Sequence, residues 1–318
     1  MRQTSFSDAG FEKFQKKTRR EKFLKEMDQV IPWQELCKTV QKHYYKDDGV
    51  GRPPIELEIM LRIHFLQHWF NLSDPAAEEA IYDSRSMREF SRVDLGEMFA
   101  PDETTICKFR HLLEKHDLGQ KLFRKVNQHL YHKGFRVSTG TIVDATIIHA
   151  PSSTKNEEGE RDPAMQQTKK GNQWYFGMKG HIGVDSKTKL IHSAVTTAAN
   201  VHDSQVVDQL LHGSETRVWG DSAYVGQAER IRSVAPKAQI FVQAKGCKNR
   251  VLTPAERLAN RTKSSVRSRV EHAFGVIKCV FGFTKVRYRG LHKNHQRLLV
   301  VCALANLFRV RKKLLLMT

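Results

Sequence analysis

The chain has 318 residues, enough for two ordinary domains or one elaborated domain. Hydrophobic residues make up 40% and charged residues 27%, as in globular proteins, and no apolar run reaches the ~18 residues that cross a bilayer. The opening MRQTSFSDAGFEKFQKK lacks the apolar core of a secretion signal, and the five cysteines show no CxxC spacing. The composition therefore predicts a protein of the reducing cytoplasm without a membrane partner.

The formal net charge of +19 is concentrated near the carboxyl terminus. From Phe241 onward, eighteen Lys or Arg residues stand against two acids, Glu256 and Glu271, a balance of +16. Like charges at this density repel one another unless a polyanion replaces their counterions, which favours nucleic acid as the partner. The alternatives are an unusually basic surface or one that faces anionic lipid, although no amphipathic anchor supports the lipid interpretation.

The first 135 residues are predicted to be all helical. Charged and apolar residues interleave over residues 9–44, and the segment KDDGVGRPP at residues 46–54 has the composition of a linker. Further segments with helical spacing of apolar residues follow at residues 56–68, 74–84, 86–93, 102–116 and 119–134. His64 and His68 have the i, i+4 spacing of zinc ligands, but without a third ligand they are interpreted as core or surface histidines.

Residues 136–318 are predicted to form a separate α/β domain. Enrichment in Val, Ile and Thr predicts three sequential strands, at residues 137–150, 176–188 and 190–200. The expected elements after them are a helix at 204–211, a strand at 216–220, a helix at 227–235, a strand at 238–245 and a long helix from about 264 to 280. This order predicts a ribonuclease H-like mixed sheet flanked by helices. The polar residues 153–172 are expected to form a mobile loop.

Asp144 is the first candidate for a functional site. It lies centrally in the apolar run TIVDATII, on the same strand face as Ile142 and Ile148. Because an ionised carboxylate is costly to bury alone, such a residue usually binds a cation, accepts several hydrogen bonds or lies at a rim. The plainer interpretation is an aspartate at a strand end that backbone N–H groups satisfy.

Asp221 and Glu271 are the second and third candidates. Asp221 follows the predicted strand TRVWG, at the carboxyl end where α/β sheets place their ligands, although an aspartate there is often a helix cap. Glu271 lies in the predicted helix SVRSRVEHAFGVIKCVFG, with Arg267 one turn before it and Lys278 two turns after it. A surface ion pair with Arg267 is the ordinary explanation for such a glutamate.

Together the three carboxylates match the chemistry that cleaves phosphodiester bonds. Oxygen ligands suit Mg²⁺ or Mn²⁺, and two such ions about 4 Å apart activate a nucleophile and stabilise the leaving oxygen. Water, and later a DNA 3′-hydroxyl, is the expected nucleophile. Arg267 and Lys278 are then expected to contact phosphate; the alternative is that they pair with Glu271 or remain solvated.

Several separate blocks of the chain give it a close resemblance to a known family. The blocks are PWQELCKTVQKHY, RPPIELEIMLRIHFLQHWFNLSDPAAEEAIYD, PDETTICKFRHLLE, TIVDATIIHAPSSTKN, DPAMQQTKKGNQWYFGMKGHIGVD, TTAANVHDSQ and RSRVEHAFGVIKCVFGF. They resemble the DDE transposases of bacterial insertion sequences, specifically the insertion-sequence-five group.

The resemblance implies a ribonuclease H-like catalytic core and a helical amino-terminal region that helps to bind the element's terminal repeats. It also implies metal-dependent strand cleavage and transfer, with Asp144, Asp221 and Glu271 as catalytic residues and ligands of Mg²⁺ or Mn²⁺, as two ions. The expected partners are double-stranded DNA, as terminal inverted repeats and target, and a second copy in the synaptic complex. The expected location is the bacterial cytoplasm, at the nucleoid.

The chain departs from the pattern of the wider superfamily at one position. Relatives often carry the spacing YxxRxxxExxxxxxK, and here Ser264 stands in place of the tyrosine while the Arg, Glu and Lys keep their spacing. Any role that this tyrosine has in relatives is therefore not expected in this chain. Only about residues 246–263 separate the last predicted strand from the glutamate helix, so the large insertion domain of some relatives is not expected.

Further basic residues are candidates for DNA contact. Lys108 and Arg110 lie on a predicted helix in a region that could hold a helix-turn-helix, although such helices often simply pack. The other candidates, Lys155, Lys169 and Lys170, lie in the polar loop, where a solvated loop is the alternative.

Two further pairs of residues have more than one interpretation. Trp174 and Tyr175 could stack on an unpaired base, but core packing is favoured. His202 and Asp203 precede a predicted helix, and capping by Asp203 is the simplest explanation. The competing functions are a ribonuclease H-like endonuclease without strand transfer and a catalytically silent DNA-binding regulator.

Overall fold

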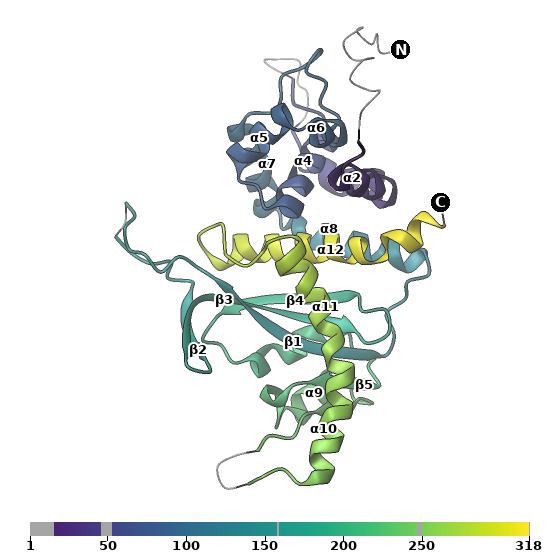
Figure 1. Ribbon diagram of the computed structural model, residues 1–318, viewed down its shortest axis with the longest axis vertical. Coiled ribbons are helices and arrows are strands. Elements are labelled where there is room, and N and C mark those ends of the chain that lie inside the picture. Colours follow the sequence, from purple (N-terminus) through teal and green to yellow (C-terminus); the bar gives the residue numbers. More distant parts are fainter. Residues whose placement is uncertain (1–15, 46–52, 158, 247–249, 318) are drawn as a thin grey trace.

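The computed structural model describes residues 16–45, 53–157, 159–246 and 250–317. Figure 1 shows a helical part at one end, a sheet in the middle and a long helical rod that extends past the sheet at the other end. Residues 46–52 of the predicted linker lie outside the described residues. Within the described part, no helix is both long enough and apolar enough to span a membrane.

The described residues of the amino-terminal part are mainly helical, as predicted, whereas residues 9–15 of the first predicted helical segment lie outside the described residues. Its helices are α2 (Arg19–Val30), α3 (Trp33–Gln41), α4 (Leu57–Phe70), α5 (Asp74–Asp83), α6 (Arg85–Ser91), α7 (Glu103–Lys115) and α8 (Leu118–His132). Thr18, Ser73 and Asp102 cap α2, α5 and α7 by accepting hydrogen bonds from backbone N–H groups of the first turn. Helix α4 is buried along almost its whole length, so the other helices pack around it.

The sheet contains β1 (Gly140–His149), β2 (Gln166–Lys170), β3 (Gln173–Asp185), β4 (Ile191–Ala198), β5 (Arg217–Gly220) and β6 (Gln239–Val242). Its order is β2-β3-β1-β5-β6, and β4 also pairs with β3. The β1–β3 and β3–β4 pairs are antiparallel, whereas β5 is parallel to both β1 and β6. An antiparallel meander followed by two parallel strands is the predicted ribonuclease H-like arrangement.

Helical elements cover both faces of this sheet. Between the strands lie η1 (Asp203–Leu210), η2 (Ser222–Tyr224) and α9 (Ala228–Val234), and after them α10 (Pro254–Arg267), η3 (Ser268–Val270), α11 (Glu271–Gly275), η4 (Val276–Val280) and α12 (Leu291–Leu315). Val143 and Val218 share one core with η1, Tyr224 and α9. Ile142 and Ile182, on the opposite face, share the other core with α11, η4 and α12.

The polar segment 153–172 differs from its prediction as a mobile loop. Residues Gln166–Lys170 form β2, which pairs with the start of β3 in a hairpin, from Gln166 opposite Gly177 to Lys170 opposite Gln173. The hairpin forms because β3 begins before the pairing region of β1 and its free backbone groups find partners in β2. Met165, immediately before β2, is 1% exposed and anchors the hairpin.

Two features of the carboxyl-terminal part were not predicted. The helix expected from about Ser264 begins at Pro254, where Thr253 and Glu256 form a capping box. Helix α12 was not predicted at all, and in Figure 1 it runs between the helical part and the sheet. Its Asn306 accepts from the Ile191 N–H at 2.8 Å and donates to Ile191 O at 2.7 Å and Asn127 Oδ1 at 2.8 Å, which ties α12 to β4 and α8.

Candidate active site

Asp144 lies on β1, and Asp221 directly follows the adjacent parallel strand β5. Ile142 of β1 pairs with Trp219 of β5, and each aspartate follows its partner in that pair by two residues. Because side chains alternate along a strand, both aspartates belong to the face that carries Ile142 and Trp219. Neighbouring strands lie about 4.8 Å apart, so the two carboxylates come from adjacent positions of one sheet face.

The Asp144 carboxylate is mostly buried, with 15% of its side chain exposed. Burial is the largest influence on it and raises its pKa to about 6, and the negative charges of Asp221 and Asp203 act in the same direction. A hydrogen bond from Ala145 N at 2.8 Å and the positive charge of Arg267 oppose this rise. A nearby cation would therefore favour the ionised form of this carboxyl.

Asp221 lies at the end of β5, directly before η2. Its Oδ1 accepts a hydrogen bond from Ala223 N at 2.9 Å, so it is the cap that the plainer interpretation expected. Capping does not exclude a second role, because one backbone hydrogen bond occupies only part of the acceptor capacity of a carboxylate. The cap fixes the carboxylate beside Asp144.

Glu271 begins α11, on the sheet face that carries both aspartates. Its side chain is 66% exposed, and its Oε1 lies 3.8 Å from Arg267 Nη2. The other guanidinium nitrogen, Arg267 Nη1, donates to Asp144 Oδ2 at 2.8 Å. Arg267 thus bridges the first and third carboxylates. Its pairing with Glu271 is the alternative that the sequence left open, and its contact with Asp144 was not predicted.

The donor set suits a hard divalent cation, because all three candidate ligands are carboxylates. Within the described part of the chain, no three His, Cys, Asp or Glu side chains converge closely enough to hold one ion. The guanidinium of Arg267 lies between Asp144 and Glu271 and is itself a positive charge held against Asp144. A site made by all three acids therefore requires Arg267 to move aside and Glu271 to turn toward the sheet.

The helical elements α10, η3, α11 and η4 follow one another as a continuous helical rod. Lys278, the other predicted phosphate contact on this rod, points toward the sheet. Its Nζ donates to Ile147 O on β1 at 2.7 Å. Partial burial is the main reason that the pKa of this amine is lowered, and the charge of Lys170 adds to the effect. Lys278 therefore joins the rod to β1 three residues beyond Asp144.

The basic candidates of the polar segment 153–172 face solvent. Lys155, Lys169 and Lys170 are all exposed, and Lys169 Nζ lies 5.8 Å from the ring centre of Trp174. Trp174 is 64% exposed, so the core packing favoured for it is wrong. Tyr175 is half-buried, with its ring centre 5.2 Å from that of His149.

The two basic candidates on α7 separate. Lys108 is exposed. Arg110 is buried at 7% exposure and forms ion pairs with Asp74 at 2.9 Å and with Glu114 at 3.1 Å. Both ion pairs lie inside the helical part, so this guanidinium is not available to bind DNA. Arg110 is therefore no longer a candidate for DNA contact.

The interpretation of His64 and His68 as core residues agrees with the structure. Both are buried, and their Nε2 atoms lie 3.0 Å apart. In this hydrogen bond one Nε2 donates and the other accepts, so the two rings are partners of each other.

A charged pair beside the aspartates was not identified from the sequence. Lys179 Nζ lies 2.8 Å from Asp203 Oδ1 and donates to Val201 O at 2.8 Å. The predicted cap is also one residue away: His202, not Asp203, caps η1 by accepting from Ser204 N. The alternating pattern of the strand locates Lys179. It does not identify Asp203 as the partner, because Asp203 follows a separate loop.

Two family models match the chain. The family described as "Transposase DDE domain" matches residues 136–307, and the family described as "Transposase domain (DUF772)" matches residues 12–112. Among solved structures, the chain is similar to a piggyBac transposase in a synaptic complex with hairpin DNA, at 10% identity and a TM-score of 0.44. The similarity covers 94% of this chain and 75% of that one. Since the first match spans more than half of the sequence, the chain belongs to the DDE transposase family.

Proposed function

We propose that the chain binds the terminal inverted repeats of an insertion sequence and catalyses metal-dependent DNA cleavage and strand transfer. Asp144, Asp221 and Glu271 are the proposed catalytic residues and metal ligands. The observation that carries this proposal is the position of Asp144 and Asp221 on one face of adjacent parallel strands, with the rod that holds Glu271 over that face. Membership of the DDE transposase family supports the same reaction class.

The proposed site works through positioning. Backbone N–H groups of Ala145 and Ala223 each hold one aspartate oxygen, so these carboxylates are oriented before DNA arrives. Two Mg²⁺ or Mn²⁺ ions, when bound, supply Lewis-acid activation of the nucleophile and stabilisation of the leaving oxygen. No side chain attacks the phosphate; water is the nucleophile of cleavage, and the freed DNA 3′-hydroxyl is that of transfer. Arg267 compensates the charge of Asp144 until the carboxylates bind the metal ions.

The partners follow from this reaction. We assign residues 1–135 to end binding and dimerisation and residues 136–318 to catalysis, with two copies holding the two ends of the element. The exposed cations Lys108, Lys155, Lys169 and Lys170 are the proposed DNA contacts outside the rod. Double-stranded DNA suits the excess of 53 Lys and Arg over 34 Asp and Glu.

A strand-transfer assay tests the proposal. The substrate is a labelled duplex that ends in the inverted repeat found beside the coding sequence, with a supercoiled plasmid as target. The full chain should cut and join this duplex in Mg²⁺ but not in EDTA, and a duplex with a scrambled repeat should remain uncut. Cutting without joining would favour an endonuclease, and binding without either reaction would favour a silent regulator.

A further inference from the structure

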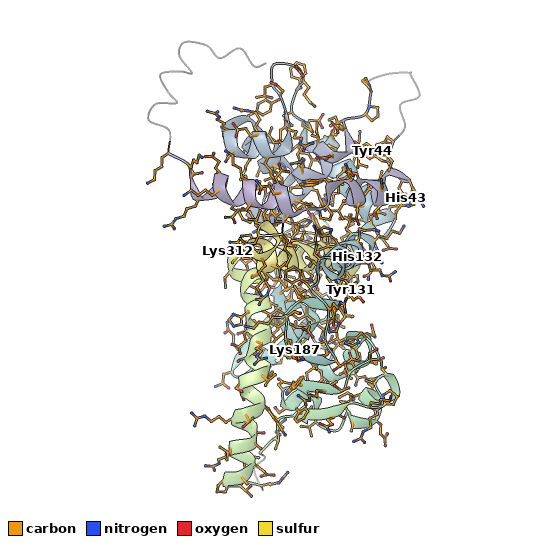
Figure 2. All side chains as sticks on the ribbon, turned by 90° about the vertical axis from the view of Figure 1, so that its right-hand side faces the viewer. His43, Tyr44, Tyr131, His132, Lys187 and Lys312 are labelled. Carbon is orange, nitrogen blue, oxygen red and sulfur yellow. The ribbon has the colours of Figure 1, made fainter. Side chains whose placement is uncertain are left out.

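Helix α10 is the helix of residues 136–318 that is least stabilised by burial of its side chains. Its fourteen residues include no buried side chain. In Figure 1 it forms the lower half of a continuous rod with α11, and in Figure 2, turned by 90°, its lower end extends past the sheet. Val266 packs against the core but is only partly buried, so hydrophobic packing explains little of why the chain maintains this helix.

One side of α10 is attached to the sheet through polar contacts. Asn260 Nδ2 donates to Ala244 O at 3.0 Å, and Lys263 Nζ donates to Val242 O at 2.7 Å. Gln243 and Ser264 add a side-chain hydrogen bond. These contacts fix the orientation of the helix, so its exposed residues are held in defined directions.

Exposed residues with helical spacing follow one flank of the rod, beside these contacts. They are Arg257, Arg261, Ser265, Ser268 and Glu271, separated by four, four, three and three positions. Residues with this spacing form one line along a helix. The line begins with two arginines, continues with two small hydroxyl side chains that allow close approach to the backbone, and ends at the third proposed catalytic acid.

The positive charge of this line is not balanced within the protein. Glu256 is the one acid of α10, and it is used by the capping box and by an ion pair with Arg250. Among the described residues, no carboxylate lies within ion-pairing distance of Arg257 or Arg261. Two fixed, exposed and unpaired guanidinium groups suit the phosphates of a polyanion.

We propose that this exposed flank of the rod binds the sugar–phosphate backbone of DNA and guides one strand toward Glu271. This inference rests on the proposed function. At a rise of 1.5 Å per residue, Arg261 and Arg257 lie about 15 and 21 Å along the rod from Glu271. At 3.4 Å per nucleotide, these distances correspond to phosphates roughly four to six nucleotides from the cleaved bond. The contacts are independent of base sequence, because phosphates carry no sequence information.

A second copy of the chain is the competing occupant of this surface. Leu258 is 68% exposed on α10 and Val251 is 76% exposed just before it. Two isolated apolar side chains beside two arginines do not form an apolar patch, and like-charged copies of the line would repel each other. Charge complementarity therefore favours DNA.

The test measures the salt dependence of DNA binding by an Arg257→Gln/Arg261→Gln variant. Lys312→Gln/Lys313→Gln is the matched control, because it removes the same charge from the end of α12, and Figure 2 shows Lys312 far from the lower end of α10. The probe is a 40-bp duplex that carries the inverted repeat, followed by fluorescence anisotropy. Loss of two phosphate contacts should lower the slope of log K against log salt by about 1.8 in the arginine variant.

Footprinting gives an independent position for these contacts. Hydroxyl-radical protection four to six nucleotides from the cleaved bond should disappear in the arginine variant and persist in the lysine control. An unchanged slope and footprint would overturn the inference, as would a loss of dimer in sedimentation at equal DNA affinity. Mg²⁺-dependent cleavage by the parent chain is measured separately. If the parent chain binds the duplex but does not cut it, the proposed function is contradicted. The salt dependence of binding still tests whether α10 contacts DNA.

Discussion

Arg267 Nη1 lies 2.8 Å from Asp144 Oδ2, and its Nη2 lies 3.8 Å from Glu271 Oε1. One guanidinium thus compensates two of the three carboxylates that the proposed reaction needs for divalent ions. Arginine stays protonated under ordinary conditions, so it competes with a metal ion for Asp144 at any working pH.

Replacement of Arg267 by Gln should tighten Mn²⁺ binding to the DNA-free protein. Removing a positive charge in contact with Asp144 lowers the electrostatic cost of bringing in a cation, by about 1.4 kcal/mol or tenfold in Kd. Arg269→Gln is the matched control, since Arg269 donates to Ser186 O. Electron paramagnetic resonance titration of free Mn²⁺ reports both constants; equal or weaker binding by the Arg267 variant would contradict the competition.

Lys179→Met should destabilise the protein by about 2 kcal/mol, because it leaves the Asp203 carboxylate uncompensated at 22% side-chain exposure. The double variant Lys179→Met/Asp203→Leu should recover most of that loss, since it removes both charges. Urea unfolding measures each free energy. Additive losses in the double variant would show that the pair is not coupled.

Arg110→Met should lower the free energy of unfolding by about 3 kcal/mol, because it leaves Asp74 and Glu114 without their shared partner. Lys108→Met on the same helix is the control and should change stability by less than about 0.5 kcal/mol. If the two variants unfold at the same urea concentration, Arg110 does not have the structural role described above.

Acidification should destabilise the helical part through His64. Burial is the main cause that lowers its pKa to about 3, whereas an unfolded histidine titrates near 6.5. The unfolded chain therefore binds the proton first, and the stabilisation present above pH 6.5 is lost as the pH falls toward 3. Between pH 6.5 and 5 the loss should be about 2 kcal/mol for this residue. His64→Gln should show a shallower decline in urea unfolding over that range; an identical decline would exclude His64 as its source.

The sequence predicted most elements because their spacing is regular. Strand β1 alternates and is rich in Val, Ile and Thr, and α7 and α8 repeat apolar residues every three to four positions. Helix α12 escaped prediction because residues 298–305 are apolar and buried on every side, which leaves no polar face to mark a helical period. The start of α10 escaped for the opposite reason, since it has no apolar face. The division at residue 135 remains a prediction.

The acids of the candidate site could be predicted from the sequence, but the contacts that they make could not. Asp144 was identified as an acid within an apolar strand, and the register of β1 with β5 then brings Asp221 beside it. The bridge from Arg267 to Asp144 depends on how the rod crosses the sheet, 123 residues away in sequence. Periodicity within one helix reveals only the pair of Arg267 with Glu271, so the contact of Arg267 with Asp144 was not predicted.

The central claim is that Asp144, Asp221 and Glu271 hold the ions that cut DNA. The most direct measurement compares Mg²⁺-dependent cleavage of the inverted-repeat duplex by the parent, Asp144→Asn, Asp221→Asn and Glu271→Gln, at DNA concentrations where all four bind equally. Each substitution should reduce the cleavage rate on the order of 1,000-fold, about 4 kcal/mol of barrier, and Glu256→Gln should cut at the parental rate. Undiminished cleavage by Asp144→Asn would contradict the assignment.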